Sequence, residues 1–267
     1  MLKTLRIMPQ NYSYLESIEN FENIDTTAQR VLITLVVDCS GSMEPHFPEL
    51  QKKFDDFIAK SKDNEDVSRC ADICIVTYGT EVTVPVRPMS IAKVSSVRFT
   101  NMGLTNTPKA LETAIEESRK WRKTIQENGM QVWKPWVVLM TDGWTTYPDL
   151  DSGYSSCYSR TKMNEIIKNS REYESNGKHH IFALGMGTDY DSNELRNITD
   201  RCLAITDWNF DDFFGWLFKS VATMSQPTIS FSGSGNAVDS DTGEEVTAVD
   251  TGEEFQAMLS KFLSVKS

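Results

Sequence analysis

The run of seven apolar or β-branched residues from Val31 to Val37 constrains the fold more than any other feature of the sequence. Such a run is typical of a strand buried on both faces, which occurs mainly in parallel sheets. The run ends at Asp38, and the residues after it read Cys-Ser-Gly-Ser. The strand therefore leads into a tight loop that carries one carboxylate and two hydroxyls. Open α/β sheets bind ligands at this edge, beyond the carboxyl ends of their strands.

Strand patterns and helix patterns alternate along the rest of the chain. Apolar runs predict strands at 31–37, 71–78, 81–88, 136–140, 180–184 and 202–205, and apolar residues at steps of three and four predict helices at 45–62, 108–127, 162–173, 192–199 and 213–224. The 81–88 segment alternates and contains two prolines, which favours an antiparallel edge strand. We predict an α/β fold, a doubly wound, mainly parallel central sheet of about six strands flanked by helices, as in Rossmann-like proteins.

The composition divides the chain into three parts. Residues 1–30 are weakly patterned and are predicted to be an N-terminal extension, and residues 31–225 form the α/β domain. Residues 226–267 are an acidic arm rich in Ser and Gly, in which the sequence Asp-Thr-Gly-Glu-Glu occurs twice. The arm ends in a predicted amphipathic helix with one apolar stripe: Phe255, Met258, Leu259, Phe262 and Leu263. This stripe either packs on its own domain or binds the groove of a partner.

Charge and composition argue against several classes of protein. The formal net charge is −11, from 38 acidic and 27 basic residues, so we expect no nucleic-acid partner. No signal peptide and no apolar run of about 20 residues is apparent, so we expect a cytoplasmic protein without a membrane span. Five cysteines without a CxxC pair and three histidines predict neither a disulfide framework nor a zinc site.

Five oxygen-bearing side chains stand on three loops near strand ends. Asp38, Ser40 and Ser42 share the first loop, Thr105 lies on the second, and Asp142 directly follows the strand at 136–140. Two carboxylates and three hydroxyls are hard ligands of the kind that Mg2+ prefers. The sequence therefore predicts a magnesium site built from these five residues.

The same residues carry a family resemblance. The segment Asp38-Cys39-Ser40-Gly41-Ser42 resembles the DxSxS signature of the metal-ion-dependent adhesion site in von Willebrand factor A (VWA) domains. Thr105 is similar to that family's lone threonine ligand, and Asp142, before Gly143, is similar to its second aspartate. One position departs from the pattern, because Leu104 stands where the family usually has a second glycine, which is expected to stiffen or reshape the loop.

The resemblance implies that the protein binds another protein rather than catalysing a reaction. A partner's Glu or Asp would complete the shell of the Mg2+ ion, for which Mn2+ or Ca2+ are possible substitutes. Ser40 and Ser42 would bind the ion directly, and Thr105 directly or through water. Asp38 and Asp142 would act mainly through waters and hydrogen bonds. Residues 133–143 further resemble the bacterial TerY-like group of tellurite-resistance and stress-response proteins.

Two other functions stay open from the sequence. The first is a Mg2+-dependent phosphohydrolase with Asp38 as its nucleophile, although Ser40 occupies the position at which such enzymes have a second Asp. The second is a scaffold in which the metal is purely structural. Trp144 lies two residues after Asp142 and is either a packing residue or a contact for a partner at the rim of the metal site.

Overall fold

The computed structural model describes residues 29–148, 157–205, 208 and 210–224, together with the main chain of 229–231, 237–239 and 245–246. Residues 1–28 of the predicted extension and the predicted C-terminal amphipathic helix lie outside the described residues. The three short segments are β7 (Ile229–Phe231), β8 (Ala237–Asp239) and β9 (Glu245–Val246), which form a three-stranded antiparallel sheet.

A six-stranded sheet in the order β3-β2-β1-β4-β5-β6 forms the centre of the molecule. Its strands are β1 (Val31–Asp38), β2 (Ala71–Tyr78), β3 (Val82–Ser90), β4 (Trp136–Thr141), β5 (His180–Met186) and β6 (Cys202–Ile205). Five strands are parallel, and β3 pairs antiparallel with β2 at the edge. Every residue of β1, β2 and β4 is buried. The predicted fold class, the strand number and the antiparallel edge strand are confirmed.

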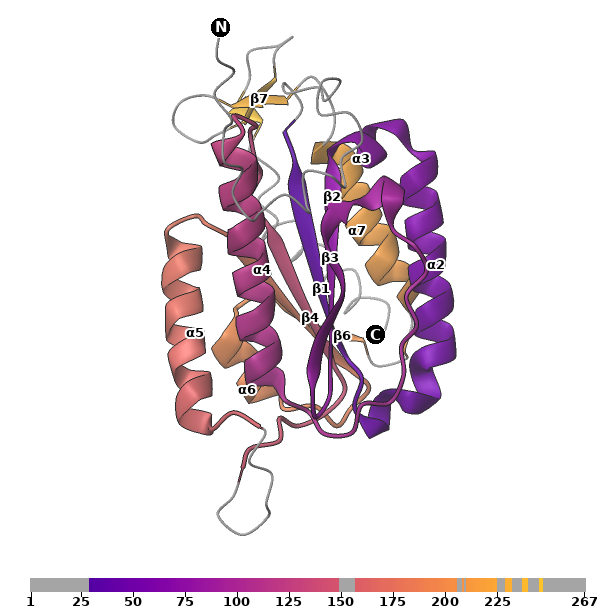
Figure 1. The fold of residues 1–267 in the computed structure, drawn as a ribbon, viewed down its shortest axis with the longest axis vertical. Coiled ribbons are helices and arrows are strands. Elements are labelled where there is room, and N and C mark those ends of the chain that lie inside the picture. The colour runs from indigo at the N-terminus through magenta and orange to yellow at the C-terminus, as the bar shows by residue number, and fades with distance from the viewer. Residues whose placement is uncertain are drawn as a thin grey trace, which may run out of the picture.

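Helices cover both faces of this sheet (Figure 1). One face carries α2 (Phe47–Asp63), α3 (Glu65–Cys70) and α7 (Phe210–Met224), and the other carries α4 (Thr107–Glu127), α5 (Arg160–Ser175) and α6 (Ser192–Ile198). Short 3-10 turns precede α2 at Gly41–His46 and follow β3 at Ile91–Lys93. The side chains of alternate strand positions pack into two separate apolar cores, one on each face. Such two-sided burial explains why the central strands are continuously apolar.

One short helix was not predicted, and the last helix of the domain begins earlier than expected. The helix α3 was not predicted, because six residues are too few to show a period; the Asn64 side chain begins it by accepting a hydrogen bond from Val67 N at 2.9 Å. The helix α7 begins at Phe210, so Asp211 and Asp212 lie in its first turn and do not precede it. Carboxylates in the first turn of a helix interact favourably with the positive end of the helix dipole.

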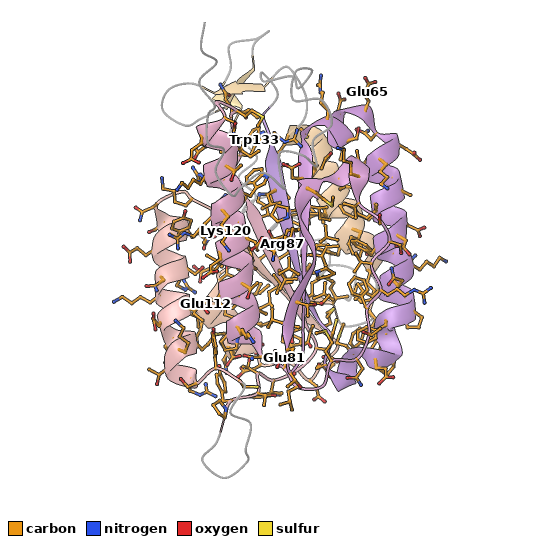
Figure 2. All side chains as sticks on the ribbon, viewed as in Figure 1. Glu65, Glu81, Arg87, Glu112, Lys120 and Trp133 are labelled. Atoms are coloured by element: carbon orange, nitrogen blue, oxygen red, sulfur yellow. The ribbon has the colours of Figure 1, made fainter. Side chains whose placement is uncertain are left out.

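A buried ion pair holds the amino ends of β1 and β2 to α4. The guanidinium of Arg30 donates two hydrogen bonds to the Asp72 carboxylate, one of them at 3.0 Å to Oδ2. The indole of Trp121 donates to the same oxygen at 2.8 Å. Arg30 also accepts from Trp133 N at 2.8 Å, and Figure 2 labels Trp133 at this end of the sheet. The carboxyl ends of the parallel strands therefore lie at the opposite end, close to Glu81 in the same view.

Within the described residues, no helix combines the length and the apolar character that crossing a bilayer requires.

Candidate metal centre

Asp38 lies at the carboxyl end of β1, beside the end of β4. The two strands are parallel, and Val37 pairs with Met140, so Asp38 faces Thr141. The Asp38 Oδ2 atom accepts a hydrogen bond from Thr141 Oγ1 at 2.6 Å, and Oδ1 accepts from Ser40 N at 2.8 Å. The side chain is fully enclosed, with 0% of its residue surface exposed. The register of the sheet thus fixes the carboxylate below the first loop.

Main-chain hydrogen bonds join the first loop, residues 39–43, to the second loop, residues 101–105. Gly41 N donates to Gly103 O at 3.1 Å, and Met102 N donates to Cys39 O at 2.7 Å. Thr80, in the turn after β2, supports the second loop from below, because its N donates to Met102 O at 2.7 Å. The two loops are therefore held together by their backbones, whatever their side chains bind.

The third loop, residues 142–146, closes the ring. Thr146 N donates to Thr105 O at 2.8 Å, and Thr105 N donates back to Thr146 Oγ1 at 3.2 Å. On the other side, Ser42 Oγ donates to Asp142 Oδ1 at 2.9 Å. Each of the three loops is thus hydrogen-bonded to the other two. Four of the five predicted ligands lie on this ring, Thr105 being tied into it through its main chain, and Asp38 lies directly below it at the end of β1.

The backbone of the second loop explains how Leu104 is accommodated. Gly103 has φ +91°, and a Cβ atom there would lie 2.6 Å from Thr80 Oγ1. Gly103 therefore takes the conformation that only glycine adopts easily. Among the described residues, Trp208 is the only amino acid other than glycine with a positive φ. Leu104 consequently has an ordinary conformation, and its N donates to Thr80 Oγ1 at 3.1 Å.

The distances between the candidate ligands suit a small octahedral cation. Ser40 Oγ and Ser42 Oγ are 3.2 Å apart, and Ser42 Oγ and Asp142 Oδ1 are 2.9 Å apart. Adjacent ligands of an octahedral Mg2+ ion, each about 2.1 Å from the metal, are about 3.0 Å apart. Ser40, Thr105 and Asp142 are buried, whereas Ser42 is exposed. The residues therefore fit a magnesium ion that is reached from solvent on the Ser42 side.

The electrostatics of the site also favour a cation. Burial raises the pKa of Asp38 to about 6, although hydrogen bonds from Thr141 and Ser40 oppose the shift. Burial likewise raises the pKa of Asp142, and the negative charge of Asp189 adds to this effect. In the described part of the chain, neither Asp38 nor Asp142 forms an ion pair with Lys or Arg. Two buried carboxylates without a Lys or Arg partner are costly to keep ionised, although His46 and a hydrogen bond from Ser42 oppose the rise in the pKa of Asp142, and a bound divalent ion would lower that cost.

The candidate ligands of this site are all oxygen atoms. Over the described residues, no group of three His, Cys, Asp or Glu side chains is arranged to hold a metal. The candidate set instead combines three hydroxyls with two carboxylates. Hydroxyl, carboxylate and water oxygens are the ligands of Mg2+, Mn2+ and Ca2+, whereas zinc prefers nitrogen and sulfur.

Metal affinity and the stability of the metal-free protein are expected to respond to pH in opposite directions. The folded pKa of Asp38, about 6, lies above its ordinary value of 3.8, so the folded protein holds this proton more tightly than the unfolded chain. The stability contributed by this group therefore rises as the pH falls from above 6 toward 4. A metal ion must displace the same proton, so its affinity should fall below pH 6, by up to about tenfold per pH unit.

Thermal melts in EDTA and Mg2+ titrations, each at about pH 7.5 and about pH 5.5, measure both effects. The variant Asp200→Asn, which changes an exposed aspartate that pairs with Arg171, is the control. A metal affinity that is equal at the two pH values would contradict the assignment of Asp38 to the site.

Thr141 and Thr146 also belong to the site but were not predicted from the sequence. Thr141 shares the Asp38 carboxylate with Ser40, and Thr146 joins the second loop to the third. The position of Thr141 could have indicated its role, because it ends a buried strand directly before Asp142. The position of Thr146 gave no such indication, because its partner lies 41 positions away in the sequence.

Trp144 projects from the third loop into solvent. Its residue surface is 66% exposed, and it is the only large hydrophobic residue exposed in the described part of the chain. Of the two interpretations left open by the sequence, packing is therefore wrong for Trp144. Cys39, in contrast, is fully buried, and burial raises the pKa of its thiol to about 12, so it is a packing residue and no nucleophile.

Comparison with known proteins agrees with this architecture. A model of the von Willebrand factor type A domain family matches residues 33–215. A comparison with curated protein sequences found no match.

Several solved structures are similar. The vWF domain of the type V pilus tip protein Mfa5 from Porphyromonas gingivalis is 14% identical, with a TM-score of 0.52, over 75% of this chain and 97% of that one. The pilus adhesin SpaC from Lactobacillus rhamnosus GG is 16% identical, with a TM-score of 0.53, over 73% of this chain and 31% of that one. Proximal thread matrix protein 1 from the mussel byssus is 20% identical, with a TM-score of 0.47, over 76% of this chain. This chain covers 47% of that mussel protein, about half its length. The pilus proteins share the fold of this chain.

Proposed function

Because this chain belongs to the von Willebrand factor type A family, whose model matches residues 33–215, we propose that it is a non-enzymatic module that binds Mg2+ and, through the ion, another protein. Mn2+ or Ca2+ would substitute for Mg2+ at the same site. The proposed ligands are Asp38, Ser40, Ser42, Thr105 and Asp142.

One observation carries this proposal, the closed ring of three loops around a buried carboxylate. Asp38 is fully buried and has no cationic partner among the described residues, while Ser40, Ser42 and Asp142 form a chain of oxygens above it. A divalent ion at this position would balance the carboxylates and replace the hydrogen bonds between the ligands. Because Ser42 is exposed, the ion would keep a coordination position open to a partner's Glu or Asp.

The same burial argues against the phosphohydrolase alternative. A phosphorylated substrate would have to bring its phosphorus atom against an oxygen of the aspartate nucleophile, and Asp38 is fully buried beneath the first loop. An experiment distinguishes a purely structural metal from a metal that bridges to a partner. If the metal is purely structural, EDTA would lower the melting temperature but would leave partner binding intact below it.

The proposed setting is the cytoplasm of a bacterium, in a tellurite-resistance or stress-response system. The five free thiols support a reducing compartment. The net charge of −11 supports a protein partner rather than a nucleic acid, and no membrane attachment is proposed. The resemblance of residues 133–143 to TerY-like proteins supports the stress-response setting, which the identity of the partner would test.

Partner capture from native lysate, in Mg2+ and in EDTA, tests the proposed function. A metal-bridged partner should be retained in Mg2+, lost in EDTA, and lost with Asp38→Asn in either buffer. Asp200→Asn, an exposed charge-matched control, should retain it. Each retained protein is then tested with its own surface Asp and Glu residues changed to amides, and one such change should abolish binding. Retention that is equal in Mg2+ and EDTA would refute the proposal.

Trp144→Ala is expected to weaken partner binding by at least about tenfold, because an exposed Trp beside a bound ion is a typical anchor of an interface. Its affinity for Mg2+ should stay within about twofold, since the side chain is not a ligand. Titration of the partner and of Mg2+ separately, with Trp144→Phe alongside, measures the two effects. Full partner affinity in Trp144→Ala would place the interface elsewhere.

A further inference from the structure

Glu194 is a buried carboxylate that contacts the third loop from outside the metal site. It lies on α6, and only 10% of its side chain is exposed. Its Oε2 atom accepts a hydrogen bond from the Tyr147 hydroxyl at 2.6 Å, and its Oε1 atom accepts a short one from Thr145 Oγ1. The nearest cation, Arg160, is 4.0 Å away and largely exposed. The two hydroxyls are therefore the main partners of this buried charge.

These hydroxyls flank the part of the third loop that closes the ring. Thr146, between Thr145 and Tyr147, is the residue that exchanges two hydrogen bonds with Thr105. Thr145 Oγ1 also lies 2.9 Å from Thr107 Oγ1, at the start of α4. Glu194 thus fixes the loop on both sides of the residue that joins it to the threonine ligand.

The helix that carries Glu194 is anchored independently of the metal loops. Asp191 Oδ1 accepts hydrogen bonds from Asn193 N and Glu194 N at 3.0 Å and so begins α6. Leu195 and Ile198 are buried against the sheet. A helix anchored in this way, with a charged acceptor against two loop hydroxyls, can determine where that loop lies.

We propose that Glu194 is a positioning residue for the metal centre, which holds the third loop in the conformation that presents Asp142 and Thr105 to the ion. This inference rests on the proposed function, because it assumes that the ring binds a metal. Glu194 is itself none of the five proposed ligands, so the inference adds a supporting residue to the site. It predicts that the metal affinity depends on a contact made through Thr145 and Tyr147.

The experiment compares Glu194→Gln with the wild-type protein in two measurements. Without the acceptor charge, amide hydrogen exchange of residues 143–147 in EDTA should be faster, and the affinity for Mn2+, followed by electron paramagnetic resonance, should fall by about tenfold. Tyr147→Phe removes one of the two hydroxyls and should give a smaller fall. Glu165→Gln, an exposed carboxylate on α5, is the charge-matched control and should bind Mn2+ normally.

A second control separates positioning from general stability. Ile198→Val loosens the packing of α6 but leaves the contacts of Glu194 in place, so it should lower the melting temperature without lowering Mn2+ affinity. If Glu194→Gln binds Mn2+ as the wild type does, or if Ile198→Val weakens Mn2+ binding equally, the positioning role is refuted. If the wild-type protein itself does not bind Mn2+, the proposed function fails and the inference fails with it. The wild-type titration therefore identifies which of the two is wrong.

Discussion

Asp38→Asn should make the metal-free protein more stable and should make it indifferent to Mg2+. In the absence of metal, the carboxylate is buried without a cationic partner, and the pKa of Asp38 is about 6 rather than 3.8. At about 1.4 kcal/mol per pH unit, that interval corresponds to about 3 kcal/mol of lost stability at neutral pH. An amide of the same shape removes this cost, and its oxygen still accepts from Ser40 N. The same change removes the negative charge that a cation would require.

Thermal melts of both proteins at about pH 7.5, in EDTA and in Mg2+, measure this prediction. In EDTA the variant should melt several degrees above the wild type. In Mg2+ the wild type should gain stability and the variant should not. A variant that melts below the wild type in EDTA would show that Asp38 stabilises the fold, and a variant that Mg2+ still stabilises would place the ion elsewhere.

Asp72→Ala should have the largest effect on folding, at the opposite end of the sheet. Asp72 is fully buried and receives hydrogen bonds from Arg30 and Trp121. Its removal leaves a buried guanidinium without its carboxylate and an indole N–H without this acceptor. Breaking a buried ion pair from one side typically costs about 3–5 kcal/mol. We expect a loss of this size in the free energy of unfolding.

Urea denaturation of Asp72→Ala and Asp72→Asn measures that loss. The amide keeps one acceptor oxygen, so Asp72→Asn should lose less stability than the alanine variant. Below the unfolding transition, both variants should bind Mg2+ as the wild type does, because the pair lies at the amino ends of the strands. A loss of Mg2+ affinity in folded Asp72→Asn would mean that the two ends of the sheet are coupled.

Much of the fold was predictable because the strong signals were local. The continuous apolar runs of β1 and β4 identified the central parallel strands, and the alternation and prolines of β3 identified the antiparallel edge. The six-residue α3 was missed because its sequence is shorter than two helical turns. The start of α7 was placed too late, at residue 213, because Asp211 and Asp212 are residues of the kind that precede a helix, whereas the structure has them in the first turn.

The candidate ligands were identified in a different way, because Asp38, Ser40, Ser42 and Asp142 lie at or just after the ends of buried strands, and Thr105 was identified through the family resemblance. What the sequence could not provide is the set of contacts that joins the loops. The bond between Thr141 and Asp38 spans 103 positions, and the bond between Ser42 and Asp142 spans 100. The support from Glu194 spans 49 positions and has no local pattern. Such contacts depend on the register of the sheet and the placement of α6, which only the three-dimensional structure provides.

The three loops, with Glu194 against the third, surround the candidate metal site. Burial keeps Asp38 and Asp142 away from water, and the ring of hydrogen bonds holds the hydroxyls of Ser40 and Ser42 close together. The cost of two unbalanced carboxylates is the reason that a cation should bind there. The exposure of Ser42 and Trp144 is the reason that a partner should bind to that cation.

A crystal structure of the protein grown in Mn2+, with an anomalous difference map, tests the central claim most directly. The account predicts one strong peak about 2.1 Å from both Ser40 Oγ and Ser42 Oγ, within the ring of the three loops. It predicts no such peak in crystals of Asp38→Asn grown in the same way. A peak elsewhere on the domain, or an empty ring at a saturating concentration of Mn2+, would contradict it.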